Sequence, residues 1–165
     1  LEFRRVLFPS KVKEIMATDL KTVGKNESLK TVAAQMAKAN IGSLPVVDEN
    51  QQVIGMITDR DLSIAFSKID KTANEIKVQE VMTKNVFTCK EEDDPVTALG
   101  IMRTKKVGRL PVVDTQNKLK GIITLDSILR KAQHTSDEEE ILFRGKENVL
   151  NTLNSIAERN ELEVH

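Results

Sequence analysis

The stretch that decides the fold is Gly-Ser-Leu-Pro-Val-Val-Asp at residues 42–48, which returns as Gly-Arg-Leu-Pro-Val-Val-Asp at residues 108–114. A second stretch behaves in the same way, because Gly-Met-Ile-Thr at 55–58 returns as Gly-Ile-Ile-Thr at 121–124. One offset of 66 residues relates both pairs (42 to 108, 55 to 121). A shared offset indicates that the second half of the chain repeats the first.

The repeat extends well beyond these two stretches. At the same offset, Val12–Thr58 aligns without a gap with Val78–Thr124, and 15 of the 47 paired positions are identical. Chance would give roughly three identities at typical residue frequencies. A repeat of this length is one supersecondary unit that buries its apolar face against its copy. We therefore expect an α/β fold built as a pseudo-twofold pair, with two related clefts between the copies.

Composition narrows the class of protein. At 165 residues and 39% hydrophobic, the chain can bury one core or two small cores. Lys plus Arg equals Asp plus Glu at 25 each, which disfavours nucleic acid and anionic membranes as partners. The low aromatic content of 3% disfavours a stacking platform for single strands. A single cysteine, Cys89, and the lack of an apolar run of roughly 20 residues predict a soluble, cytoplasmic protein.

Each repeat predicts the same order of elements, namely helix, strand, helix, strand, strand, helix. A short helix is expected at 12–16 and again at 78–82, followed by extended pieces at 20–23 and 86–89. Strands are expected at 44–47 and 53–57, with each proline at a strand start, where its missing donor costs least. The last helix of each repeat should begin after Thr58 and after Thr124.

The central helix of each repeat has clear start signals. Ser28 suits an N-cap, and its counterpart Asp94 is followed by Pro95, which favours a first helical position. Gly42 and Gly108 should end these helices as left-handed caps. The apolar faces are predicted to comprise Leu29, Val32, Ala33 and Met36 in the first copy, and Val96, Leu99 and Met102 in the second.

The remaining segments fall outside the repeats. Residues 1–10 are set aside as an N-terminal extension or a scar of sequence assembly. Repeat one covers 11–68, a polar connector covers 69–77, and repeat two covers 78–131. Residues 132–165 are predicted to form a C-terminal helical extension. Its apolar stripe consists of Ile141, Leu142, Val149, Leu150, Leu153, Ile156 and Ala157.

The doubled element order, together with Leu-Pro-Val-Val-Asp and the Gly-Met-Ile-Thr-Asp-Arg-Asp run at 55–61, resembles the cystathionine-β-synthase (CBS) domain. Two such domains in tandem resemble a Bateman module, over about residues 11–131. The resemblance implies a regulatory module that binds adenosine-containing ligands, AMP, ADP or ATP, with S-adenosylmethionine as a further candidate. It also implies association of two copies into a homodimer and an effector protein that reads the bound state.

Thr58 and Asp61 match the Thr-x-x-Asp ligand motif of this family. A carboxylate can accept both ribose hydroxyls, and a threonine hydroxyl with free N–H groups at a helix start can meet a phosphate. The same spacing is also typical of a capping box, with Thr58 at the N-cap and Asp61 three residues later, and both roles can hold together. By resemblance, the same site would also contain Arg109 for phosphate and Met56, Phe87 and Pro111 as apolar contacts.

The second copy departs from the motif. Thr124 is retained, but Ser127 stands where Asp61 does, and the acid lies one residue earlier at Asp126. One residue turns a helical side chain by roughly 100°, so Asp126 should not reach the position of Asp61. The second cleft, with Thr124, Asp126, Ser43 and Pro45, is therefore expected to bind more weakly. Arg109 is alternatively a solvated arginine, and Arg103, Lys105 and Lys106 are expected to form a solvated helix face.

No residue pattern predicts catalysis. Cys89 lacks a neighbouring base and is read as a small apolar strand residue, since its counterpart is Val23. A metal site would need a cluster of His, Cys and carboxylate ligands that the sequence lacks, and no glycine-rich phosphate loop occurs. Two alternatives stay open, a ligand-silent dimerisation module and a regulatory fragment of a larger enzyme or transporter.

Overall fold

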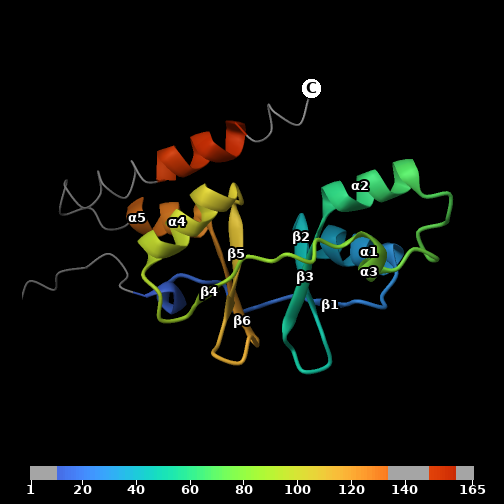
Figure 1. Ribbon diagram of the computed structural model, residues 1–165, viewed down its shortest axis with the longest axis horizontal. Coiled ribbons are helices and arrows are strands. Elements are labelled where there is room, and N and C mark those ends of the chain that lie inside the picture. Colours follow the sequence, from blue (N-terminus) through green and yellow to red (C-terminus); the bar gives the residue numbers. More distant parts are fainter. Residues whose placement is uncertain (1–10, 134–148, 159–165) are drawn as a thin grey trace, which may run out of the picture. The chain divides into compact units, whose positions relative to one another are not determined.

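The computed structural model describes residues 11–133 and 149–158, whose helices and strands are drawn in Figure 1. The first copy contains η1 (Val12–Glu14), β1 (Val23–Gly24), α1 (Leu29–Ala39), β2 (Ser43–Val47), β3 (Val53–Thr58) and α2 (Asp59–Lys68). The second contains α3 (Val78–Val81), β4 (Cys89–Lys90), α4 (Pro95–Lys105), β5 (Arg109–Val113), β6 (Leu119–Thr124) and α5 (Leu125–Gln133). The predicted α/β class and element order are confirmed in both copies. Ile141, Leu142 and the 1–10 extension lie outside the described residues.

The strands form two three-stranded sheets, β1-β2-β3 and β4-β5-β6. The short strands β1 and β4 run parallel to β2 and β5, so the predicted extended pieces become regular only at Val23 and Cys89. The prediction that each proline starts its strand is wrong, because Pro45 and Pro111 are the third residues of β2 and β5. Proline has no backbone N–H to donate. Pro45 is tolerated because β1 pairs only with Val46 and Val47, so no residue of β1 needs a hydrogen bond from Pro45.

The central helices begin as predicted and end differently. Ser28 Oγ accepts from the Thr31 N–H at 3.3 Å, and Asp94 Oδ1 accepts from the Val96 N–H at 2.6 Å. The residues in the left-handed conformation at the ends of α1 and α4 are Asn40 (φ 52°) and Lys106 (φ 53°), so the prediction of glycine caps is wrong. An asparagine tolerates this conformation well, whereas a lysine adopts it at some cost.

The buried faces of α1 and α4 use equivalent positions. Helix α1 buries Leu29, Val32 and Met36, as predicted, and the fourth predicted residue, Ala33, is half-buried against the same core. In α4 the buried side chains are Pro95, Ala98, Leu99 and Met102. The assignment of Val96 to that face is wrong, because Val96 is 49% exposed. Its counterpart at the 66-residue offset is Lys30, an exposed position, so the repeat itself places residue 96 on the solvent side.

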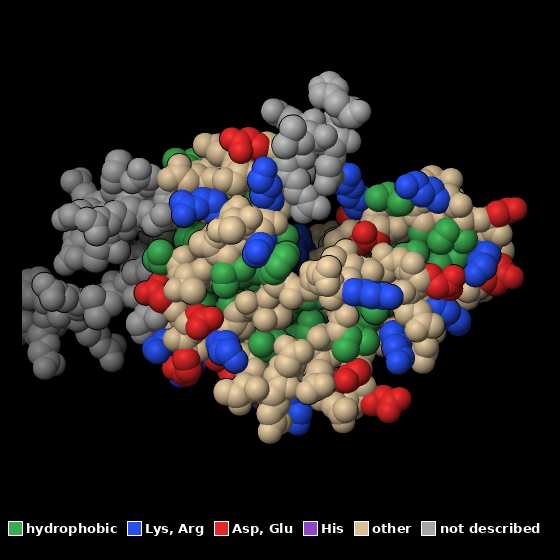
Figure 2. Space-filling model, in the orientation of Figure 1, with side chains coloured by type: hydrophobic (Ala, Val, Ile, Leu, Met, Phe, Trp, Pro, Cys, Tyr) green, Lys and Arg blue, Asp and Glu red, His purple; other side chains and the backbone are tan. Residues whose placement is uncertain are grey.

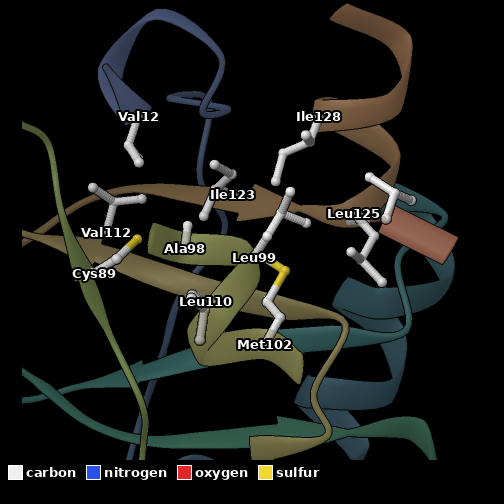
Figure 3. Packing of buried hydrophobic residues seen from close by; sticks show 11 residues of the cluster. Val12, Cys89, Ala98, Leu99, Met102, Leu110, Val112, Ile123, Leu125 and Ile128 are labelled. Atoms are coloured by element: carbon white, nitrogen blue, oxygen red, sulfur yellow. The ribbon is translucent and has the colours of Figure 1, made fainter. Parts of the chain in front are cut away.

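The described chain divides into two compact units that differ from the sequence repeats at their leading segments. The repeat-two unit contains residues 11–18, 87–114, 120–133 and 149–158. The repeat-one unit contains residues 19–86 and 115–119. Segment 12–17 thus belongs with the second copy, and α3 belongs with the first. Val12 is fully buried beside Val112 and Ile123 (Figure 3), and Val78 is fully buried in the other core.

Backbone hydrogen bonds hold each leading segment in place. In the repeat-two unit, Val12 N–H donates to the Asp93 carbonyl at 2.9 Å, and Ala17 exchanges bonds with Ile122 at 2.9 and 3.0 Å. In the repeat-one unit, Val78 N–H donates to the Glu27 carbonyl at 3.0 Å, and Thr83 exchanges bonds with Met56 at 2.9 Å each way. Each leading segment therefore extends the edge of the sheet that it joins.

Two further segments complete the cores. The connector carries Ile76, which is fully buried in the repeat-one unit and whose carbonyl accepts from the Leu29 N–H at 3.0 Å. Residues 149–158 form a helix, drawn in red in Figure 1, that confirms a helical extension in this part of the chain. Val149 is 1% exposed in the repeat-two core, and Ile156 packs against that core. Leu150 and Leu153 on the same helix are 59% and 42% exposed.

Candidate functional site

Thr58 and Asp61 meet at the junction where β3 ends and α2 begins. Asp61 Oδ2 accepts from the Thr58 N–H at 2.8 Å and from the Thr58 hydroxyl at 2.7 Å. The Asp61 N–H donates in turn to Thr58 Oγ1 at 3.2 Å, which completes a capping box. The hydrogen bonds found for the Asp61 carboxylate within the described residues all use Oδ2, which leaves Oδ1 for a second acceptor role.

The first N–H groups of α2 already have partners, so the expectation that they are free is wrong. The Asp59 N–H donates to the Gly42 carbonyl at 3.0 Å, and the Arg60 N–H donates to Asp59 Oδ1 at 2.7 Å. With Asp61 bonded to Thr58, three donors at this helix start already have partners. Gly42 makes the arrangement possible, because a Cβ there would lie 2.9 Å from Asp59 Oδ2. A phosphate at this helix start would have to replace one of these partners or bind to side chains.

The second copy caps its helix with a hydroxyl in place of the carboxylate. Ser127 Oγ accepts from the Thr124 N–H at 3.1 Å, and Thr124 Oγ1 accepts from the Ser127 N–H at 3.0 Å. Asp126 lies on the exposed side of α5, where its Oδ2 accepts from Arg130 Nε at 2.8 Å. Ser127 thus occupies the position of Asp61, and Asp126 points elsewhere, as the helical rotation predicts.

The strand residues differ in their access to solvent. Arg109 begins β5 and is exposed, whereas its counterpart Ser43 begins β2 and is only 4% exposed. Pro45 and Pro111 are buried within their strands, and Met56 in β3 is half-buried. Arg109 is therefore the member of this group that presents a cation on the surface of the repeat-two unit.

Phe87 and Lys105 form a contact that the sequence did not predict. Phe87 is 39% exposed, and Lys105 Nζ lies 4.8 Å from the centroid of its ring. This distance is within the range of a cation–π interaction. The sequence places Lys105 on a solvated helix face, and the residue is indeed exposed, so the contact with the ring is an addition to that prediction. Eighteen positions separate the two residues in the sequence, so no local spacing rule could have paired them.

Cys89 is a core residue. It is 2% exposed in β4, and burial, with a further contribution from Asp93, raises the pKa of its thiol to about 12. The thiol is therefore neutral and unreactive at physiological pH, which agrees with its reading as a small apolar strand residue.

Charge and metal-ligand patterns give no competing site in the described part of the chain. Lys and Arg are interspersed with Asp and Glu on the face shown in Figure 2. Across residues 11–133 and 149–158, no group of three or more His, Cys, Asp or Glu is placed to hold a metal ion. Within these same ranges, every helix is too short or too polar to cross a membrane.

The fold and the repeated strand–helix junctions are those of a CBS domain pair. The CBS domain family matches residues 12–68 and 78–134, and the chain belongs to this family. A CBS pair is a regulatory module, which in larger proteins forms one part of the chain.

Two curated relatives of this chain are both longer than it is. Inosine-5'-monophosphate dehydrogenase of Methanocaldococcus jannaschii is 38% identical over 124 residues, which are 75% of this chain and 24% of the relative. An uncharacterised protein of Methanopyrus kandleri is 34% identical over 119 residues, which are 72% of this chain and 61% of the relative. The chain thus spans between about a quarter and three fifths of these relatives.

Solved structures of CBS pairs match over most of the chain. The CBS domain pair of protein MJ0100, in complex with 5'-methylthioadenosine and S-adenosyl-L-methionine, has a TM-score of 0.68 and 30% identity. The match covers 78% of this chain and 100% of the MJ0100 domain pair. CBSX2 in complex with AMP has a TM-score of 0.69 and 25% identity, with the same coverage of 78% and 100%.

Proposed function

We propose that this CBS pair is a non-catalytic sensor of adenine nucleotides, namely AMP, ADP or ATP. The observation that carries the proposal is the Thr58–Asp61 junction, where a carboxylate uses one oxygen for the helix cap and keeps the other available. A carboxylate oxygen suits the ribose hydroxyls of an adenosine-containing ligand. The ligands named for MJ0100 and CBSX2 support this ligand class, and S-adenosylmethionine belongs to it.

The remaining roles follow from the chemistry of each side chain. Arg109, an exposed cation at the start of β5, would contact phosphate. Phe87, Pro111 and Met56 would supply apolar contacts to adenine. The second set, Thr124, Asp126, Ser43 and Pro45, would bind more weakly, because Asp126 faces Arg130 and Ser43 replaces the arginine.

Calorimetric titration with adenosine, AMP and ATP tests these roles. Loss of one charge-assisted hydrogen bond costs about 1.5–3 kcal/mol, or roughly 10–100-fold in affinity. We expect close to one high-affinity nucleotide per chain, and we expect Arg109→Ala to weaken AMP and ATP while leaving adenosine nearly unchanged. Arg103→Ala removes one cation from α4 and serves as the control. Equal weakening of adenosine and ATP by Arg109→Ala would show that Arg109 supports the fold.

Asp61 needs a variant that separates binding from capping. Asp61→Asn keeps an oxygen that can accept from the Thr58 N–H, so the cap should survive, because asparagine and aspartate are similar at capping. Its nucleotide affinity should fall about 10–100-fold, because the charged acceptor is lost. Ser127→Asp is the converse variant and should strengthen the weaker set. Normal binding by both Asp61→Asn and Asp61→Ala would reduce the motif to a helix cap.

Assembly into a homodimer is proposed on the helix at residues 149–158. Residues 149–157 carry no charged side chain, although 30% of the chain is charged, and this helix exposes Leu150 and Leu153. Depletion of charge around exposed apolar side chains is typical of interface cores. Light scattering at micromolar concentration should report a dimer, and Leu153→Asp should shift it to monomer while Asn154→Asp does not. A wild-type monomer would overturn this part of the proposal.

A larger regulated protein is the second candidate context. The match to about a quarter of inosine-5'-monophosphate dehydrogenase favours it, because there the CBS region accompanies a catalytic part. In either context, ligand binding would shift the packing of the module, which an effector protein or catalytic domain reads. A cytoplasmic location fits the reduced, buried Cys89. Sequencing of the surrounding reading frame decides between the two contexts.

A further inference from the structure

We propose that Lys105 covers the Phe87 ring in the free protein and leaves it when a phosphate-bearing nucleotide binds. The proposal rests on the proposed function, because it takes Phe87 as an adenine contact. It adds a specificity device to that site. Lys105 would disfavour the nucleoside and favour the nucleotide, and ATP would gain most because it carries the most negative charge.

The geometry of α4 places Lys105 where it can act in this way. Lys105 is the last residue of α4, and Lys106 turns the chain through a left-handed conformation directly after it. The Lys106 N–H donates to the Arg103 and Met102 carbonyls, which holds this turn in place. Lys105 Nζ then lies 4.8 Å from the Phe87 centroid. Of the acidic residues in the described ranges, none makes an ion pair with Lys105, so the ring face is its partner.

The ring face can hold one partner at a time. Phe87 is 39% exposed, and adenine stacking on the face that Lys105 covers would displace the ammonium group. An exposed cation–π contact contributes about two- to five-fold to an equilibrium. Adenosine has no phosphate group with which the displaced lysine could form a charge-assisted hydrogen bond. A nucleotide offers phosphate oxygens, to which a lysine makes charge-assisted hydrogen bonds.

The first copy lacks both members of the pair. At the 66-residue offset, Phe87 corresponds to Lys21 and Lys105 to Ala39. Lys21 has its own partner, because its Nζ lies 3.5 Å from Asp19 Oδ1. The ring and its covering cation are therefore specific to the repeat-two unit, which also carries Arg109. A packing requirement shared by both copies would not explain the pair.

The experiment compares Lys105→Ala with wild type by calorimetry, using adenosine and ATP as the two probes. Uncovering the ring should tighten adenosine binding about two- to five-fold. Loss of the phosphate contact should weaken ATP binding about ten-fold or more. Arg103→Ala is the matched control, since it removes a cation from the last turn of the same helix. It should leave adenosine unchanged and weaken ATP by less than Lys105→Ala does.

A second readout follows the lysine directly. In the free protein, the Lys105 ε-methylene protons should show an upfield ring-current shift in NMR spectra, which Phe87→Leu abolishes and saturating ATP also removes. Opposite changes for adenosine and ATP, with loss of the shift, support the proposal. Changes of the same sign for both ligands, or a shift that persists with ATP bound, would overturn it and leave nucleotide sensing intact. Failure of wild type to bind either probe would overturn both.

Discussion

Asp61 carries more charge than its structural task requires. In the second copy, Ser127 caps the equivalent helix with a neutral hydroxyl and makes the same reciprocal bonds with Thr124. The fold therefore does not demand a carboxylate at this position. A helix start does favour a negative side chain, by roughly 0.3–1 kcal/mol at an exposed site. That preference would be satisfied by any acidic residue in the first turn of α2, and Asp59 already provides one.

Some contacts of the candidate site could be predicted from the sequence, and others could not. The Thr58–Asp61 spacing was sufficient to predict a capping box. The one-residue displacement of the acid in the second copy was sufficient to predict that Asp126 does not reach the equivalent position. The occupied N–H of Asp59 was not predictable, because its partner is the Gly42 carbonyl, which only tertiary packing brings to the start of α2, whereas Arg60 bonds to the side chain of its neighbour Asp59. The Lys105–Phe87 contact could not be predicted from the sequence either, because tertiary packing brings the two residues together.

Cys89 predicts a pH dependence of stability. Because burial raises the pKa of its thiol from 9.0 to about 12, the folded state keeps a proton that the unfolded state loses. This contribution is fully present below about pH 9 and is lost as pH rises towards 12, with a slope of up to about 1.4 kcal/mol per pH unit. Urea unfolding of wild type and Cys89→Val from pH 7.5 to 11 should give curves that diverge above pH 9. Parallel curves would contradict this assignment.

For the helices and strands, the sequence repeat predicted their order better than the residues at which they begin and end. The strand and helix sequence of each copy followed from the offset and from the N-cap residues Ser28 and Asp94. The caps at the other helix ends were missed because the left-handed residues are Asn40 and Lys106, two positions before the glycines. The buried face of α4 was misassigned at Val96, although comparison with Lys30 at the offset would have corrected it.

The glycines of the two Gly-x-Ile-Thr stretches are explained by the leading segments that cross them. A Cβ at Gly55 would lie 2.6 Å from Met82 Sδ and 3.2 Å from the Thr83 carbonyl. A Cβ at Gly121 would meet Met16 Sδ and lie 3.0 Å from the Ala17 carbonyl. The methionine can move, but the carbonyl belongs to the bonded sheet edge and cannot move freely.

This crowding predicts opposite effects for alanine at different glycines. Gly55→Ala and Gly121→Ala should each destabilise the protein by about 1–3 kcal/mol, as overpacking does. Gly100→Ala is the control, since Gly100 lies inside α4 and a Cβ added there would meet nothing within 4 Å. It should stabilise by roughly 0.5–1 kcal/mol, because alanine is the better helix former. Denaturant unfolding measures all three, and neutral effects at both strand glycines would contradict the crowding.

At the scale of the whole molecule, the two copies in the sequence are not the two units in space. Each compact unit takes its leading segment from the other copy, so neither copy has a complete core of its own. The 66-residue offset could not reveal this exchange of leading segments. Val12 and Val78 occupy equivalent positions in the repeat whether each packs against its own copy or against the other copy. The exchange ties the stability of each unit to residues that lie far away in the sequence.

The exchange predicts that a substitution in one copy weakens the other. Val12 is fully buried with Val112 and Ile123, so Val12→Ala should cost about 1–3 kcal/mol through lost burial and an added cavity. Hydrogen exchange should then show lower protection at the amides of Val112 and Ile123, and unchanged protection at Val46 and Ile57. Val78→Ala is the matched variant and should give the reverse pattern, because Val78 lies in the core with Val46 and Ile57. Loss of protection by Val12→Ala confined to Val46 and Ile57 would place the leading segment with its own copy, and equal loss in both units would mean that they unfold as one cooperative body.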